Sequence, residues 1–193
     1  MTADPVLEAS LARQTQALLR GDPYRMACLR LARTLALPDW ALGAGFVRNL
    51  IWDHLHGCSE PTPLNDLDLI YLDPADQTGA GEARHEAWLA ARLSGPWQVR
   101  NQARMHLRQG VAPFTSSEQA LSHWVELPTC IGVRLLPDDS LQWLAPFGFA
   151  PGWSLAVQPN ERCRQPRAVF HERVASKGWR QIWPRLRIPD SAI

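Results

Sequence analysis

The feature that most constrains the fold is a short apolar strand pattern that carries two acids. In the segment Asn65–Asp73, NDLDLIYLD, the apolar residues Leu67 and Leu69 alternate with Asp66 and Asp68. This period of two predicts a strand with a buried apolar face. Residues two apart on a strand point to the same side and lie about 7 Å apart at their Cα atoms. The two carboxylates are therefore expected to converge on one site beside a β-sheet.

A helix with a glycine-rich start precedes this strand. In the segment Trp40–Gly57, WALGAGFVRNLIWDHLHG, apolar residues recur at helical spacing and predict a helix over Gly45–His56. Its N-terminus is built from Gly43, Ala44 and Gly45. The free backbone N–H groups and the positive dipole end of a helix bind phosphate groups. Glycine suits this position because a side chain would hold a phosphate away from the backbone.

Two interpretations of this glycine and acid pattern compete. A dinucleotide-binding fingerprint needs a third glycine, a long strand before the first glycine and an acid at the end of the second strand. Arg48 occupies the third position, only Trp40–Leu42 precedes Gly43, and Asp66 opens its strand. A metal site is the better interpretation, because carboxylates on one strand face can hold Mg²⁺, which also binds substrate phosphates.

The remaining pattern predicts an α+β fold with a small mixed β-sheet flanked by helices. Helices are expected over residues 5–20, 23–37, 45–56, 81–93 and 167–177, with a further one after a capping box at 116–119. Strands are expected over 66–72 and 97–101, with a hairpin of 131–136 and 141–145, and residues 40–42 form a short extended piece at most. We expect a single domain over residues 1–193, divided into a helical segment 1–39, a core 40–145 and a C-terminal extension 146–193.

Charge and cysteine usage limit the partners and the compartment. The formal net charge is +1, which argues against long nucleic acid as a partner. Four dispersed cysteines, no apolar run of membrane length and no signal pattern predict a cytoplasmic protein without membrane contact. The arginines of the C-terminal part could meet a phosphate-rich acceptor, but a solvated face is the expected place for them; they are Arg162, Arg164, Arg167 and Arg173.

Several segments together resemble a known family. They are GAGFVRNLIWDHLHG, NDLDLIYLD, WQVRNQARMH, PFTSSEQALSHW, APFGF and FHERVASKGWRQIWPRLRI, and they extend from about Trp40 to Ile188. The glycine-opened helix followed by Asp-Leu-Asp on a strand resembles the DNA polymerase beta superfamily of nucleotidyltransferases. The joint run of segments is similar to a family of small bacterial nucleotidyltransferase-like proteins within it.

This resemblance implies a nucleotidyltransferase-like core and a Mg²⁺-dependent enzyme. Such an enzyme moves a nucleoside monophosphate from a nucleoside triphosphate to an acceptor, here one that is unknown and is expected to be a small molecule or a protein. Catalytic and metal-binding roles fall on Asp66 and Asp68, which would hold Mg²⁺ or Mn²⁺. Nucleotide-binding roles fall on the helix start and two polar residues, namely Gly43, Ala44, Gly45, Arg48 and Asn101. The polar run Asn101–His106, NQARMH, is also expected to bind substrate.

One departure from the superfamily puts the activity in question. The superfamily often uses a third carboxylate on a neighbouring strand as general base, and the strand Trp97–Asn101 is expected to occupy that place. The face shared by Trp97, Val99 and Asn101 carries no acid, and an asparagine can orient a ligand but cannot accept a proton. Unplaced candidates for the base are Glu126, Asp138 and Asp139. The alternative function is a catalytically degenerate nucleotide-binding or interaction module of the same fold.

Overall fold

The computed structural model describes residues 4–164 and 167–189. Its centre is a five-stranded sheet in the order β3-β2-β1-β4-β5. The strands are β1 (Ala41–Gly43), β2 (Leu67–Tyr71), β3 (Trp97–Asn101), β4 (Gly132–Leu135) and β5 (Leu141–Leu144). Strands β2 and β3 pair in parallel, and the other neighbouring pairs are antiparallel. The prediction of an α+β fold with a small mixed sheet is confirmed.

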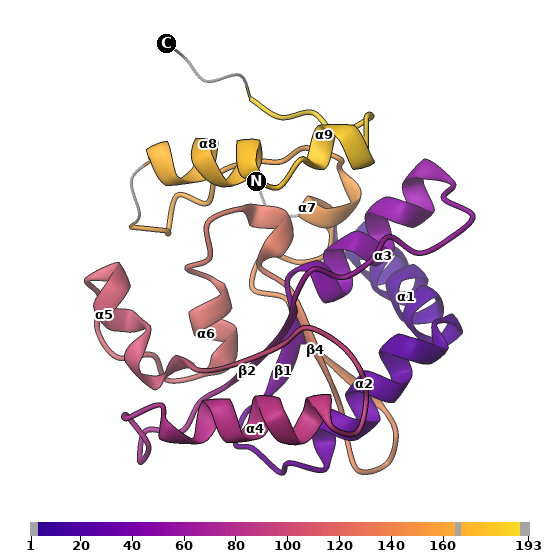
Figure 1. Cartoon of the computed structure of the whole chain (residues 1–193). Helices are drawn as coiled ribbons and strands as arrows, with labels where there is room; N and C mark the ends of the chain where they lie inside the picture. Colours follow the sequence, from indigo (N-terminus) through magenta and orange to yellow (C-terminus); the bar gives the residue numbers. More distant parts are fainter. Residues whose placement is uncertain (1–3, 165–166, 190–193) are drawn as a thin grey trace.

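Helices surround this sheet (Figure 1). They are α1 (Pro5–Gly21), α2 (Pro23–Arg33), α3 (Gly45–His56), α4 (Ala80–Ala90), α5 (His106–Gln109), α6 (Ser117–Leu121), α7 (Ala150–Trp153), α8 (Arg167–Ser176) and α9 (Trp179–Ile182). In Figure 1, α1, α2 and α3 lie on one side of the sheet, α5 and α6 lie on the other, and α8 and α9 lie across one end. Over the described ranges, no helix combines the length and apolar character needed to cross a bilayer.

The shortest strand, β1, has a larger role than its sequence predicts. The segment 40–42 was expected to be a short extended piece at most, yet Ala41–Gly43 lies at the centre of the sheet. Leu42 pairs with Leu69 of β2 on one side and with Val133 of β4 on the other. Three residues are too few to show a periodicity, so only this pairing identifies the strand. Because β1 leads directly into α3, it fixes the position of the glycine-rich helix start.

The two faces of the sheet bury different residues. On one face, the alternating residues Leu67 and Leu69 of β2 and Val99 of β3 belong to the main core with helices α1, α2 and α3. On the other face, Ile70 packs in a smaller cluster with Leu121 of α6. Because side chains alternate between faces, Asp66 and Asp68 lie on the same face as Ile70. The site acids therefore lie opposite the main core.

Tryptophan side chains pack the C-terminal segment against α3. The ring centre of Trp52 lies 5.4 Å from that of Trp179 and 5.0 Å from that of Trp183, both edge-on. Trp183 also donates a hydrogen bond of 2.8 Å from its indole nitrogen to the carboxylate of Asp53. All three rings are almost fully buried. These contacts fix α9 and, through it, the end of α8 beside the start of α3.

Candidate functional site

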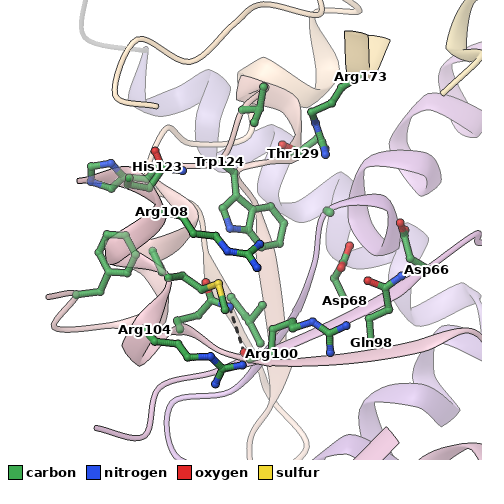
Figure 2. A pocket seen from close by; sticks show the side chains of 18 of the residues that line it. Asp66, Asp68, Gln98, Arg100, Arg104, Arg108, His123, Trp124, Thr129 and Arg173 are labelled. Carbon is green, nitrogen blue, oxygen red and sulfur yellow. Dashed lines mark hydrogen bonds between the residues drawn. The ribbon is translucent and has the colours of Figure 1, made fainter. Parts of the chain in front are cut away.

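A cavity of about 1060 Å³ lies on the face of the sheet that carries Ile70. Its charged and aromatic lining consists of Asp66, Asp68, Glu82, Arg100, Arg104, Arg108, Arg173, Lys177, Phe114, His123 and Trp124. Figure 2 shows Asp66, Asp68 and Gln98 toward one end of it, and Arg108, Trp124 and His123 toward the other. The cavity therefore joins an acidic end to a basic and aromatic wall.

Asp66 and Asp68 both line the acidic end, as their spacing on the strand predicts. Asp68 is on β2, and Asp66 immediately precedes the strand. Burial, followed by the negative charge of Asp66, raises the pKa of Asp68 to about 6, against the opposing effect of Lys177. A cation between two neighbouring carboxylates would offset their mutual repulsion, so this pair favours cation binding.

The donor chemistry of this end fits a hard divalent cation. Asp66 and Asp68 offer carboxylate oxygens, which Mg²⁺ and Mn²⁺ prefer. Mg²⁺ is commonly held by one or two carboxylates and takes its remaining ligands from water and substrate phosphates. Among the residues that the structure describes, no group of three or more histidine, cysteine, aspartate or glutamate side chains comes together to hold a metal. A pair of carboxylates fits a metal ion that is shared with substrate phosphates.

Two cations reach the acidic end from the C-terminal helix. The ammonium of Lys177 lies 3.2 Å from a carboxylate oxygen of Asp66. The guanidinium of Arg173 lies 2.7 Å from the carboxylate of Glu126, which is fully buried. Arg173 was expected to lie on a solvated face, and no role was expected for Lys177. Their spacing of four residues on a helix was the available signal, because such residues share a helix face.

The glycine-rich segment presents backbone N–H groups beside Asp66. Ala44 has φ 50° and ψ −120°, and its carbonyl accepts hydrogen bonds from the N–H groups of Val47 and Arg48. The first two residues of α3, Gly45 and Phe46, have no intrahelical acceptor for their N–H groups. A Cβ atom on Gly45 would lie 3.6 Å from a carboxylate oxygen of Asp66. The bare backbone at Gly45 thus leaves space between the helix start and the acid.

Gly43 and Ala44 have different surroundings. Ala44 lines the cavity. A Cβ atom on Gly43 would meet the Ile131 carbonyl oxygen at 3.2 Å and the Trp124 ring at 3.4 Å. The missing side chain at Gly43 therefore permits close packing of β1, and Gly43 is not among the residues that line the cavity.

Arg48 lies behind the carboxylates and is not among the residues that line the cavity. Its guanidinium carbon is 5.0 Å from the ring centre of Trp52 and 4.6 Å from that of Trp179, and the residue is 7% exposed. Burial lowers the pKa of Arg48 to about 10, while the negative charges of Glu126, Asp66 and Asp68 oppose this. The expected direct contact with a phosphate does not fit this geometry. The observed position makes Arg48 a buried positive charge under the acidic end.

Asn101 has a fully buried side chain that contacts backbone groups. Its side-chain oxygen accepts hydrogen bonds from the N–H groups of Asp73 and Ala103 at 3.0 and 3.1 Å. Its amide nitrogen donates to the carbonyl oxygens of Asp73 and Asp76. These four bonds use both acceptor lone pairs and both donor hydrogens of the side-chain amide. The expected nucleotide contact of Asn101 therefore does not fit the observed position, which is that of a structural residue.

The face of β3 that was assigned to the site is also wrong. Trp97 and Val99 face the main core, whereas the cavity is lined by Gln98 and Arg100. In the parallel register, Asp68 lies opposite Gln98. The error arose because the buried residues of β3 were placed on the same side as the acids of β2. Over the described part of β3, the site-facing positions still carry no acid.

Of the three acids considered as candidates for the general base, one lies near the cavity and two lie far from it. Glu126 is fully buried and bonded to Arg173, whose guanidinium lines the cavity. Asp139 lies in the β4–β5 turn and pairs with Arg33 at 2.7 Å. Asp138, in the same turn, accepts hydrogen bonds from Ser140. Of the three, Glu126 is the one that contacts a residue of the cavity, and its role there is to hold Arg173.

The run NQARMH contributes part of the basic wall. Gln102, Arg104 and Met105 of this run line the cavity. Arg104 pairs with Glu82 at 2.6 Å, and Arg100 pairs with Glu86 at 2.5 Å. Because α4 supplies these two glutamates, it orients the arginines along the cavity wall. The substrate-binding role expected for this run is compatible with its position.

Comparisons with known proteins agree with this fold. A family model described as nucleotidyltransferase matches residues 30–188. A structure determined by NMR, reported to reveal a CCA-adding enzyme head domain, matches with a TM-score of 0.80 and 28% sequence identity. The match covers 93% of this chain and 96% of the other chain. No curated protein matches the sequence.

Proposed function

Because the chain belongs to the nucleotidyltransferase family, whose model covers residues 30–188, we propose that it transfers a nucleoside monophosphate from a nucleoside triphosphate to an acceptor with the help of Mg²⁺ or Mn²⁺. The observation that carries this proposal is the meeting of Asp66 and Asp68 in one cavity beside the start of α3. Two carboxylates next to unbonded helix N–H groups suit a metal-bound triphosphate.

Asp66 and Asp68 would hold the divalent cation. When bound, the ion supplies positive charge to phosphate oxygens in a group-transfer reaction. Asp68 would bind the ion in its ionised form, and burial together with the charge of Asp66 raises its pKa to about 6. The buried guanidinium of Arg48 offsets part of the remaining negative charge from below.

The start of α3 would seat the triphosphate. The N–H groups of Gly45 and Phe46 point out of the first turn, and the helix dipole adds positive potential there. Gly45 carries no Cβ that would separate a phosphate from Asp66. The phosphates would therefore lie between the helix start and the acid pair, within reach of the cations on α8.

The basic and aromatic wall would receive the rest of the reactants. Arg104 and the ring of Trp124 line the cavity away from Asp66, and Arg100 extends toward Gln98 (Figure 2). An acceptor hydroxyl in this part of the cavity would attack the α-phosphorus and form a new P–O bond. The bond from the α-phosphorus to the bridging oxygen would break, pyrophosphate would leave with that oxygen, and the hydroxyl proton would pass to solvent. The net charge of +1 favours a small molecule or a protein over long nucleic acid as the acceptor.

A second candidate function is nucleotide binding without transfer. The observation that favours it is Gln98, which lies opposite Asp68 where a third carboxylate would complete the set. An amide at this position cannot take the proton of an attacking hydroxyl. In that case the chain would hold a metal and a nucleotide as a binding or interaction module.

The test is incubation of the protein with each nucleoside triphosphate and Mg²⁺ while pyrophosphate is measured. We expect release with one or more triphosphates, and a loss of about a hundredfold or more in Asp68→Ala, since the residue is placed to hold the ion. The control is Glu60→Ala, which removes an exposed acid outside the cavity. Saturable triphosphate binding without pyrophosphate release would instead support the binding module.

We also propose that the chain acts as one domain in the cytoplasm. One hydrophobic cluster includes Leu11 from the N-terminal segment, Leu69 from the core and Trp183 from the C-terminal extension, which supports a single folding unit. All four cysteines are free thiols, which suits a reducing compartment. If limited proteolysis removed one of these segments and the remaining fragment still unfolded cooperatively, the proposal of a single folding unit would be contradicted.

A further inference from the structure

Lys177 links the end of α8 to the acid pair. Its ammonium lies 3.2 Å from Asp66, while both side chains keep contact with solvent, at 32% and 23% exposure. It is also the only lysine in the sequence. The ammonium therefore places a single positive charge at the carboxylate that is proposed to bind a divalent ion.

The backbone that carries Lys177 is held in place on both sides. The N–H of Lys177 donates to the carbonyl oxygen of Arg173, and the guanidinium of Arg173 is fixed by Glu126. On the other side, Trp179 packs against Trp52. Only the flexible side chain of Lys177 is free to reorient, and its ammonium can turn its three donors toward different acceptors.

A metal ion and the Lys177 ammonium compete for Asp66. A divalent ion bound to this carboxylate would repel a monovalent cation about 3 Å from the same group. The next anions within the cavity would be the phosphates of a substrate seated at Gly45, whose Cβ position lies 3.6 Å from Asp66. Lys177 therefore has a phosphate acceptor available at the moment when it loses its carboxylate partner.

We propose that Lys177 is a substrate-binding residue that leaves Asp66 when the metal binds and then contacts the terminal phosphates of the triphosphate. Resting on the function proposed above, this assigns the C-terminal helix a direct part in nucleotide binding. In the absence of ligand, Lys177 substitutes for part of the missing cation charge. With ligand, it neutralises charge on the pyrophosphate portion, next to Arg173.

Binding measurements with two probes test this exchange. The probes are Mn²⁺ alone and inorganic tripolyphosphate with Mg²⁺, and the variants are Lys177→Met and Arg167→Met. The control residue Arg167 is exposed at the other end of α8 and carries the same charge. For Lys177→Met we expect Mn²⁺ affinity to rise about two- to fivefold, because the ion no longer has to displace Lys177 from Asp66. This factor corresponds to the free energy of one exposed ion pair. Tripolyphosphate affinity should fall about tenfold or more, the value of a charged hydrogen bond.

A second measurement needs no mutation. Reductive methylation with ¹³C-formaldehyde labels Lys177 and the terminal amine only, because the chain has no other lysine. We expect the Lys177 NMR signal to move on addition of Mg²⁺ and to move again on addition of tripolyphosphate. A signal that stays in place while the protein binds both probes would overturn the assignment, even if the variant fails to fold.

The outcomes separate this inference from the function on which it rests. If the wild-type protein binds neither Mn²⁺ nor tripolyphosphate, the proposed function itself fails. If it binds both, and Lys177→Met binds both with unchanged affinity, the role of Lys177 is refuted and the proposed function stands. A fall in tripolyphosphate affinity of equal size in Arg167→Met would also refute it, because general positive charge would then explain the effect.

Discussion

Asp68 of β2 lies directly opposite Gln98 of β3 in the parallel register of the sheet. Both residues line the cavity, so the position nearest to Asp68 on the neighbouring strand carries an amide. An amide contributes no charge to a cation and takes up no proton. The two carboxylates of the site therefore both come from β2 and the residue before it, and β3 contributes an amide beside them.

A third carboxylate at this place is expected to strengthen metal binding. In Gln98→Glu, the added charge lies beside Asp68, and metal affinity rises with the number of charged ligands. We expect Mn²⁺ affinity, measured by electron paramagnetic resonance, to increase about threefold or more. Gln158→Glu, an exposed change outside the cavity, serves as control. Weaker Mn²⁺ binding in Gln98→Glu would show that the acid pair is not where the ion is held.

The raised pKa of Asp68 predicts a pH-dependent stability in the absence of metal. Burial, followed by the charge of Asp66, raises this pKa from 3.8 to about 6, so the folded state binds the proton more tightly than the unfolded state does. The associated stability is present below about pH 4 and is lost as the pH rises through about 6.

Asp68→Asn removes this dependence. We expect it to raise the free energy of unfolding by about 2 to 3 kcal/mol near pH 7.5 and by about half as much near pH 5. Urea unfolding with a chelator present measures both values. A gain that is equal at the two pH values would contradict the raised pKa.

Gly45 is expected to matter for phosphate binding more than for stability. In Gly45→Ala, the new Cβ lies 3.3 Å from a guanidinium nitrogen of Arg48 and 3.6 Å from Asp66, in the space left for a ligand. We expect tripolyphosphate affinity to fall about tenfold, as for the loss of a charged hydrogen bond. Isothermal titration with Mg²⁺ present measures it. Gly21→Ala, where a Cβ meets nothing within 4 Å, should leave that affinity unchanged.

Asn101 is expected to matter for stability and not for nucleotide binding. Asn101→Ala removes a buried side chain that satisfies backbone groups of Asp73, Asp76 and Ala103. We expect the free energy of unfolding to fall by about 3 kcal/mol, because buried backbone groups lose their partners. Asn65→Ala, at an exposed position, should change it by less than about 0.5 kcal/mol. If folded Asn101→Ala lost tripolyphosphate binding specifically, the structural assignment would be wrong.

The sequence was most informative where a periodic pattern was long enough to read. The helix over Gly45–His56 and the strand over Trp97–Asn101 begin and end where predicted. The convergence of Asp66 and Asp68 also followed from the period of a strand. In contrast, β1 was underestimated because three residues show no period, and only its neighbours make it a central strand.

The residues that the sequence did not identify reach the site through tertiary packing. Lys177 meets Asp66 only because Trp179 and Trp183 attach the C-terminal segment to Trp52. The face of β3 was misassigned because strand alternation gives two faces and does not say which one meets the acids. Local patterns therefore defined the acid pair, whereas the surrounding cations depended on contacts between distant segments.

The position of α8 late in the chain has a consequence for biosynthesis. Lys177 follows Asp66 by 111 residues. At roughly 5–20 residues per second, a ribosome needs on the order of ten seconds to add the residues between them. During that interval the nascent polypeptide contains both aspartates but not the ammonium that later neutralises one of them. The ion pair between Lys177 and Asp66 therefore forms only after the C-terminal segment has been synthesised.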